Sequence, residues 1–120
     1  MTSFGEITVT DRNAWQYRAL AVLTDLQEAG HKAERYPLDW TVTSNGALRG
    51  TVPKHQPRLT DNDRRAIFDE WVRVVDGTEP RETTQFTGEI RLTSVFKVPT
   101  NRTDVQGSLV VDFDGPADEA

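Results

Sequence analysis

Cysteine is absent from this chain of 120 residues, which also contains only one methionine, two histidines and three lysines. Without cysteine the protein cannot form disulfide bonds, thiolate zinc sites, iron–sulfur clusters or a cysteine nucleophile. No apolar stretch approaches the ~18 residues of a membrane span, and no basic start precedes an apolar run as in a secretion signal. We therefore expect a cytoplasmic protein without a membrane partner.

Positive charge is also scarce, because 14 Lys and Arg face 19 Asp and Glu and the formal net charge is −5. This balance disfavours binding to the phosphate backbone of nucleic acid, although Arg64 and Arg65 form a local basic pair. Eleven of the basic residues are arginine. That skew is typical of GC-rich coding and indicates a GC-rich bacterium or its phage.

The chain does contain clear hydrophobic periodicity. Residues 5–10 alternate apolar and polar side chains, which predicts a short strand. Apolar residues then recur at helical spacing in two segments, which predicts one helix over 13–29 and a second over 61–76.

Capping residues mark the ends of both predicted helices. Thr10 or Asp11 would cap the first helix, and residues 60–63 fit a capping box at the start of the second. Gly30 would end the first helix in the left-handed conformation, and Gly77 would end the second.

Residues 38–52 predict a β-hairpin around Asn45-Gly46. A two-residue loop would direct the apolar residues of its two strands to opposite faces. A three-residue loop over 44–46, with Gly46 left-handed, directs them all to one face and is therefore preferred. Its register pairs Val42 with Leu48, Trp40 with Gly50, and Leu38 with Val52.

Two longer alternating segments follow, over 86–98 and 105–113, and predict a second hairpin with one apolar face. Phe86 belongs to the apolar set of the first segment. Residues 77–85 read as a polar loop, and residues 114–120 as an acidic flexible tail.

These elements predict a single α+β domain over 1–113, in the order β-α-ββ-α-ββ. An antiparallel sheet of four to five strands would carry both helices packed on one face. The expected core includes Trp15, Leu23, Trp40, Phe68, Trp71, Leu92, Phe96 and Leu109. The opposite face is polar, and its candidate interaction residues are Thr41, Thr43, Arg49, Arg91, Thr93 and Lys97.

The two histidines, His31 and His55, could form a metal site with Glu34 or Asp39. Their spacing matches no ligand motif, however, and both histidines fall in predicted loops. We therefore expect no metal site.

Paired carboxylates are a second candidate for chemistry, since hydrolysis by acid–base catalysis needs two of them. They are Asp61, Asp63, Asp69 and Glu70 on or near the second helix, and Asp112 and Asp114 near the chain end. Helix-start electrostatics and a polar helix face already explain the first four. We expect neither catalytic residues nor a cofactor.

The three tryptophans, Trp15, Trp40 and Trp71, could line a ligand pocket between sheet and helices. Each also falls in the same periodic stripe as ordinary core residues, and a small domain needs large rings to fill its core. The core interpretation is preferred.

Three segments carry a resemblance: Leu-Asp-Trp-Thr-Val at 38–42, Leu-Arg-Gly-Thr-Val at 48–52 and Phe-Asp-Glu-Trp at 68–71. With the first amphipathic helix they resemble short uncharacterised proteins of actinobacteria and their phages, over about residues 15–75. The matching positions are expected core positions, so the resemblance implies a fold and no activity. The element order is also similar to a ferredoxin-like arrangement with one extra strand.

The leading hypothesis is a non-enzymatic domain that binds another protein, as an accessory or inhibitor protein of a phage or mobile element. The alternative is a small-molecule-binding domain or small enzyme with its pocket among the tryptophans. A polar-lined cavity that reaches those rings would favour the alternative.

Overall fold

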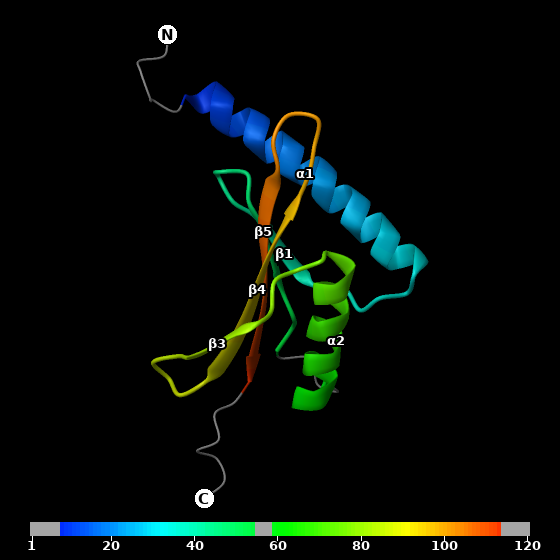
Figure 1. Ribbon diagram of the computed structural model, residues 1–120, viewed down its shortest axis with the longest axis vertical. Coiled ribbons are helices and arrows are strands. Elements are labelled where there is room, and N and C mark those ends of the chain that lie inside the picture. Colours follow the sequence, from blue (N-terminus) through cyan, green and yellow to red (C-terminus); the bar gives the residue numbers. More distant parts are fainter. Residues whose placement is uncertain (1–7, 55–58, 114–120) are drawn as a thin grey trace, which may run out of the picture.

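The computed structural model describes residues 8–54 and 59–113, which form two helices and one five-stranded sheet (Figure 1). The elements are α1 (Val9–Lys32), β1 (Asp39–Val42), β2 (Leu48–Thr51), α2 (Asp61–Val74), β3 (Arg81–Thr84), β4 (Ile90–Val98) and β5 (Val105–Phe113). The predicted α+β class is confirmed. The order is α-ββ-α-βββ, not the predicted β-α-ββ-α-ββ.

The sheet has the strand order β1-β2-β5-β4-β3 and is mixed, so the predicted all-antiparallel sheet is wrong. β2 and β5 run parallel, with Leu48 opposite Gly107 and Gly50 opposite Leu109. This register joins the apolar face of the first hairpin to the apolar face of β4 and β5. β5 is therefore the central strand that links both halves of the sheet.

The first hairpin has the predicted three-residue loop. Val42 lies opposite Leu48, Trp40 lies opposite Gly50, and Gly46 has a φ of 77°. The Trp40 ring covers the glycine closely, since a Cβ built on Gly50 would lie 2.9 Å from ring carbons of Trp40.

The hairpin predicted from residues 86–98 and 105–113 is confirmed, since β4 and β5 pair antiparallel. A further hairpin joins β3 to β4, where a polar loop was predicted for residues 77–85. β3 consists of Arg-Glu-Thr-Thr and is exposed along its length, so it carries no apolar alternation that could mark it as a strand. β4 begins at Ile90, and Phe86 lies in the turn. The predicted strand start at residue 86 is therefore wrong.

α1 begins earlier than predicted, because Thr8 caps it. The Thr8 hydroxyl accepts from the Asp11 amide at 3.0 Å, and the Asp11 carboxylate accepts from the Thr8 amide at 3.1 Å. This reciprocal capping box makes Val9 and Thr10 helical, where a strand was predicted. Residues 5–7 of that predicted strand lie outside the described residues, as does the tail at 114–120.

Neither predicted glycine stop is left-handed. Gly30 remains inside α1, and Glu34 takes the positive φ of 56° after the helix ends. α2 has the predicted capping box and ends at Val74, with Asp76 at a φ of 54°. Gly77 instead allows the Ser94 hydroxyl to approach the backbone closely, because a Cβ there would lie 2.3 Å from Ser94 Oγ.

Both helices pack on the apolar face of the sheet, around one buried cluster. Its members are Ala19, Val22, Leu23, Leu38, Leu48, Val52, Phe68, Trp71, Val75, Leu92, Phe96, Val105, Leu109 and Val111. Six of the eight predicted core residues belong to it. Trp15 and Trp40 are only half-buried, so for these two the core prediction is wrong.

Candidate functional site

The indole rings of Trp40 on β1 and Trp71 on α2 meet edge to face, with centroids 5.9 Å apart and planes at 78°. Trp71 is only 2% exposed, and its Nε1 donates a hydrogen bond to the Tyr36 carbonyl at 2.9 Å. Nε1 is the only polar atom of an indole, so Trp71 presents ring carbons to its other neighbours.

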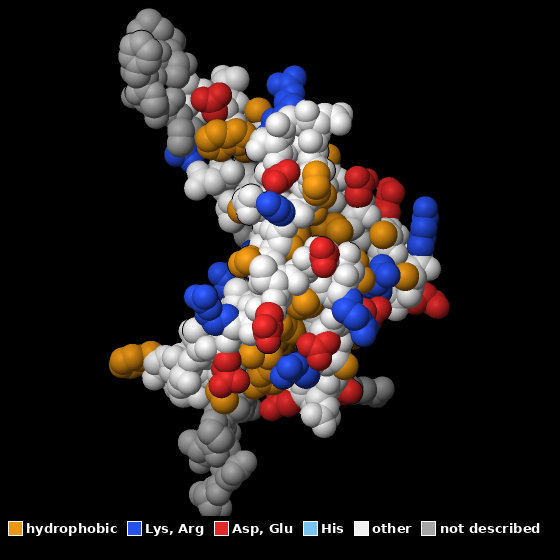
Figure 2. All heavy atoms as spheres, in the orientation of Figure 1, with side chains coloured by type: hydrophobic (Ala, Val, Ile, Leu, Met, Phe, Trp, Pro, Cys, Tyr) orange, Lys and Arg blue, Asp and Glu red, His pale blue; other side chains and the backbone are white. Residues whose placement is uncertain are grey.

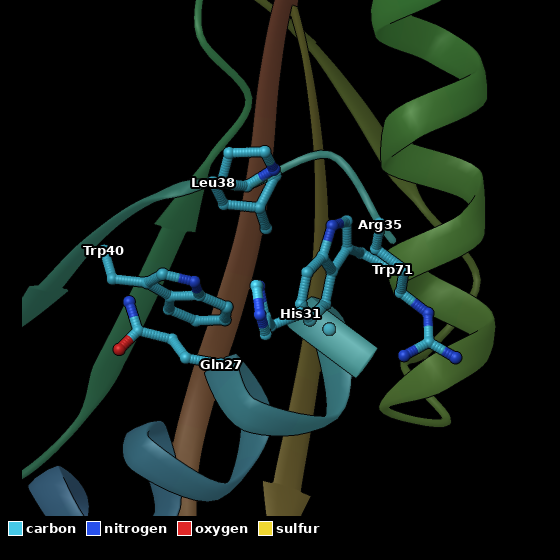
Figure 3. Close-up of a pocket in the computed structure, with 8 residues that line it drawn as sticks. Gln27, His31, Arg35, Leu38, Trp40 and Trp71 are labelled. Carbon is cyan, nitrogen blue, oxygen red and sulfur yellow. The ribbon is translucent and has the colours of Figure 1, made fainter. Parts of the chain in front are cut away.

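A cavity of about 210 Å³ opens beside these two rings, between the C-terminal turns of α1, β1 and α2 (Figure 3). Its lining consists of Gln27, Gly30, His31, Arg35, Pro37, Leu38, Trp40 and Trp71. The cavity therefore reaches two of the three tryptophans and includes polar side chains. This is the observation that favours the small-molecule alternative.

Trp15 lies elsewhere. It packs against the turn of the first hairpin, where a Cβ built on Gly46 would lie 2.6 Å from both Cβ and the backbone oxygen of Trp15. The structure thus brings Trp40 and Trp71 together and leaves Trp15 out of their cavity.

The predicted metal candidates are not assembled by the described residues. His31 is exposed at the end of α1, Glu34 lies beyond the helix, and Asp39 begins β1. His55 lies outside the described residues. Within residues 8–54 and 59–113, no group of three His, Asp or Glu side chains could hold a metal ion.

Among the described residues, the candidate catalytic carboxylates each contact a structural partner. Asp61 pairs with Arg64, and Asp63 belongs to the capping box of Thr60. Along α2, Asp69 binds Arg65 at 3.1 Å, while Glu70 lies 3.4 Å from Arg35 Nε. Asp114 lies outside the described residues.

The basic pair at the start of α2 is not displayed together on the surface. Arg64 is only 5% exposed and lies over the Phe113 ring, with its Cζ 5.8 Å from the centroid. Arg65 is engaged by Asp69. α2 therefore uses Arg64 for packing, a role that no pattern in the sequence indicates.

The face of the sheet opposite the helices carries five of the six predicted interaction residues. The cross-strand register aligns Thr41 with Arg49 and Arg81 with Thr93, while Arg91 and Lys97 also lie on this face. The sixth residue, Thr43, belongs to the first turn, where its hydroxyl accepts from the Ala47 amide. Val110 on the same face is 3% exposed, so β5 is buried on both sides at this position, whereas Gln106 on the same face is exposed.

An ion pair between β4 and β5 dominates the electrostatics of this face. Arg91 Nε and Nη2 donate to the two Asp112 carboxylate oxygens at 2.7 and 3.1 Å. These hydrogen bonds lower the pKa of Asp112 from its usual range, against the effect of burial, and the charges of Arg91, Lys54 and Arg49 add to the lowering. The same bonds raise the pKa of Arg91.

The turn of the β3–β4 hairpin carries an unburied aromatic residue. Phe86 is 107% exposed, and a Cβ built on Gly88 would have no neighbour within 4 Å. Figure 1 shows this turn standing away from the helices, and Figure 2 shows hydrophobic atoms clear of the main body on that side. The sequence contains a signal for this turn, because Gly88 follows Phe86-Thr87 as Gly46 follows Ser44-Asn45.

Comparison with protein-family models, with curated proteins and with solved structures finds no match. Within the described residues, no helix has the length and apolar character needed to span a membrane.

Proposed function

We propose that this protein is a non-enzymatic interaction domain that binds another protein through the β3–β4 hairpin and the adjoining polar sheet face. The observation that carries the proposal is the full exposure of Phe86 at an ordered turn. Its assignment as an accessory or inhibitor protein of a phage or mobile element rests on the resemblance of residues 15–75.

Two backbone hydrogen bonds close the Phe86 turn. The Gln85 amide donates to the Glu89 carbonyl at 2.7 Å, and the Gly88 amide donates to the Gln85 carbonyl at 2.9 Å. The backbone of such a turn needs little further ordering when Phe86 enters a pocket, so the cost falls mainly on the Phe86 side chain. Buried aromatic anchors contribute most of the binding energy at protein interfaces.

The polar face beside the hairpin has the composition of an interface rim. Arg91 and Thr93 lie on β4, which continues directly from the Phe86 turn, and exposed Arg49 lies farther along the same face, at the level of Val95. Charged and hydroxyl side chains around an apolar anchor favour orientation and selectivity over raw affinity. The partner that fits this arrangement has an apolar pocket with an acidic or hydroxyl-rich border.

The roles of the carboxylates support a binding function over a catalytic one. Asp61, Asp63, Asp69, Glu70 and Asp112 all engage ion pairs or a helix cap. Catalysis by paired carboxylates needs at least one such group free to exchange a proton with a substrate.

Photocrosslinking in the producing cells tests the proposal. Replacing Phe86 by p-benzoylphenylalanine keeps an aromatic ring at the turn, and irradiation should attach one partner protein to this position. The same replacement at Tyr17, which is exposed on α1, is the matched control. The purified partner should bind Phe86→Ser at least tenfold more weakly than the wild type, with an unchanged melting temperature.

Three results would contradict the proposal. They are the absence of any adduct at position 86, the same set of adducts at positions 86 and 17, and an adduct only to a second copy of this chain.

A further inference from the structure

The cavity beside Trp40 and Trp71 has the size of a one- or two-ring molecule. An engineered apolar cavity of about 150 Å³ binds benzene, whereas drug-sized ligands occupy about 300–1,000 Å³. The volume of about 210 Å³ lies between these limits. Gly30 sets one wall, because a Cβ there would lie 3.2 Å from Cη2 of Trp71.

Its aromatic walls favour a flat occupant. The two indole planes meet at 78° and form a corner, with one ring on β1 and the other on α2. The Trp71 nitrogen is already bonded to Tyr36, so the walls offer stacking and edge contacts without a hydrogen-bond donor from Trp71. Aromatic rings stack on such surfaces in offset or edge-to-face arrangements.

Two polar side chains lie on one border of the cavity. Gln27 and His31 are one turn apart on α1, and Figure 3 shows both directed toward the space beside Trp40. Within the part of the chain that the structure describes, neither side chain forms a hydrogen bond. An amide and an imidazole together can both donate and accept.

Charge at the cavity favours a neutral molecule. Arg35 is the charged lining residue, and its guanidinium is engaged by Glu70 and by the Ala29 carbonyl. Figure 3 shows this group beside α2, on the side of Trp71 away from Trp40. The lining includes no carboxylate to balance a cation, and Arg35 offers an anion only a group already paired.

We infer that this cavity binds a small, neutral, planar heteroaromatic molecule, with Gln27 and His31 hydrogen-bonded to its polar edge. A purely apolar occupant, such as a phenylalanine side chain of a partner, would remove water from both polar groups without replacing their hydrogen bonds. The inference is independent of the interaction proposed for Phe86, which lies on a different element.

Fluorine NMR of the protein labelled with 5-fluorotryptophan tests this inference, because Trp15 serves as an internal control. Each resonance is assigned with single Trp→Phe variants. The probe is benzimidazole, which is neutral at pH 7.5. It should shift the Trp40 and Trp71 resonances in a saturable manner and leave the Trp15 resonance unchanged.

Three compounds and two variants define the chemistry. Indene has nearly the shape of benzimidazole without its nitrogens and should bind at least threefold more weakly, as should benzoate and benzyltrimethylammonium. Gln27→Leu should weaken benzimidazole binding three- to tenfold, the effect of one hydrogen bond. The same change at exposed Gln106 on β5 should have no effect.

The inference is overturned if benzimidazole shifts no tryptophan resonance up to 5 mM or shifts all three together. Equal binding of indene would show that no polar edge is recognised. Tighter binding of either charged compound would show that the ligand class is wrong.

Discussion

The β1–β2 turn and the β3–β4 turn share one backbone pattern, but the protein packs against the glycine of only the first. In each turn the residue before a three-residue loop donates to the residue after it, as Thr43 does to Ala47 and Gln85 does to Glu89. Each loop ends in a glycine of positive φ, 77° at Gly46 and 91° at Gly88.

The surroundings of the two turns differ. α1 covers the first turn, with Trp15 against Gly46, a hydrogen bond from Gln16 Nε2 to the Thr43 carbonyl at 3.1 Å, and one from Arg12 to Asn45. At the second turn, open space surrounds the Gly88 Cα and Phe86 is exposed. The first turn is therefore part of the packed fold, whereas the second is free to serve as a contact surface.

The largest expected difference in stability is between substitutions of two phenylalanines, Phe68 in the core and Phe86 at the exposed turn. Phe68→Ala should lower the free energy of unfolding by about 3–5 kcal/mol, because the ring is fully buried and leaves a cavity. Phe86→Ala should change it by less than about 0.5 kcal/mol. Urea unfolding followed by circular dichroism measures both, and a similar loss for the two variants would break the comparison.

Alanine at the two turn glycines should separate packing from backbone strain. Gly88→Ala introduces only left-handed strain, about 1 kcal/mol. Gly46→Ala adds a Cβ 2.6 Å from the Trp15 backbone, so overpacking should raise the total to about 2–4 kcal/mol. The same denaturant titration measures the difference. Equal losses of unfolding free energy for the two variants would show that Trp15 moves aside without an energetic cost.

A smaller effect on the free energy of unfolding is expected from the Arg91–Asp112 pair, which links β4 of the β3–β4 hairpin to β5. Because the folded pKa of Asp112 is lowered, its contribution is present above the unfolded pKa of about 3.9 and disappears as pH falls through the folded pKa. We expect Asp112→Asn to cost about 1 kcal/mol at pH 7, and progressively less below pH 4. A cost independent of pH would contradict this origin.

Hydrogen exchange extends the same test to the two hairpins. Acid should lower the protection factors of β4 amides, taken relative to the intrinsic exchange rate at each pH, before those of β2, since packing rather than an ion pair holds the first hairpin. The exposed Asp25→Asn substitution on α1 is the control.

Local patterns predicted those parts of the fold in which local interactions decide the outcome. The register of the first hairpin follows from keeping Trp40 and Leu48 on one face, and the capping box at Thr60 is local in sequence. The predicted strand near the beginning of α1 failed because the Thr8–Asp11 capping box outweighs the weak β preference of Val9 and Thr10.

Other elements depend on contacts that leave no local pattern. β3 is a polar edge strand that exists because β4 supplies a pairing partner, and the parallel pairing of β2 with β5 joins residues about 60 positions apart. In the candidate site, periodicity placed Trp40 and Trp71 on apolar faces, but only the tertiary arrangement shows that they meet while Trp15 does not.

The central position of β5 has a consequence for synthesis on the ribosome. Both hairpins precede β5 in the chain, and neither pairs directly with the other in the strand order β1-β2-β5-β4-β3. The inner edge of β2 therefore stays unpaired from the time it leaves the exit tunnel until β5 has also emerged, whereas β4 can pair with β5 as soon as the two strands are out. Such an unpaired edge invites association with other chains, so a delay between the emergence of β2 and that of β5 should favour aggregation through the first hairpin.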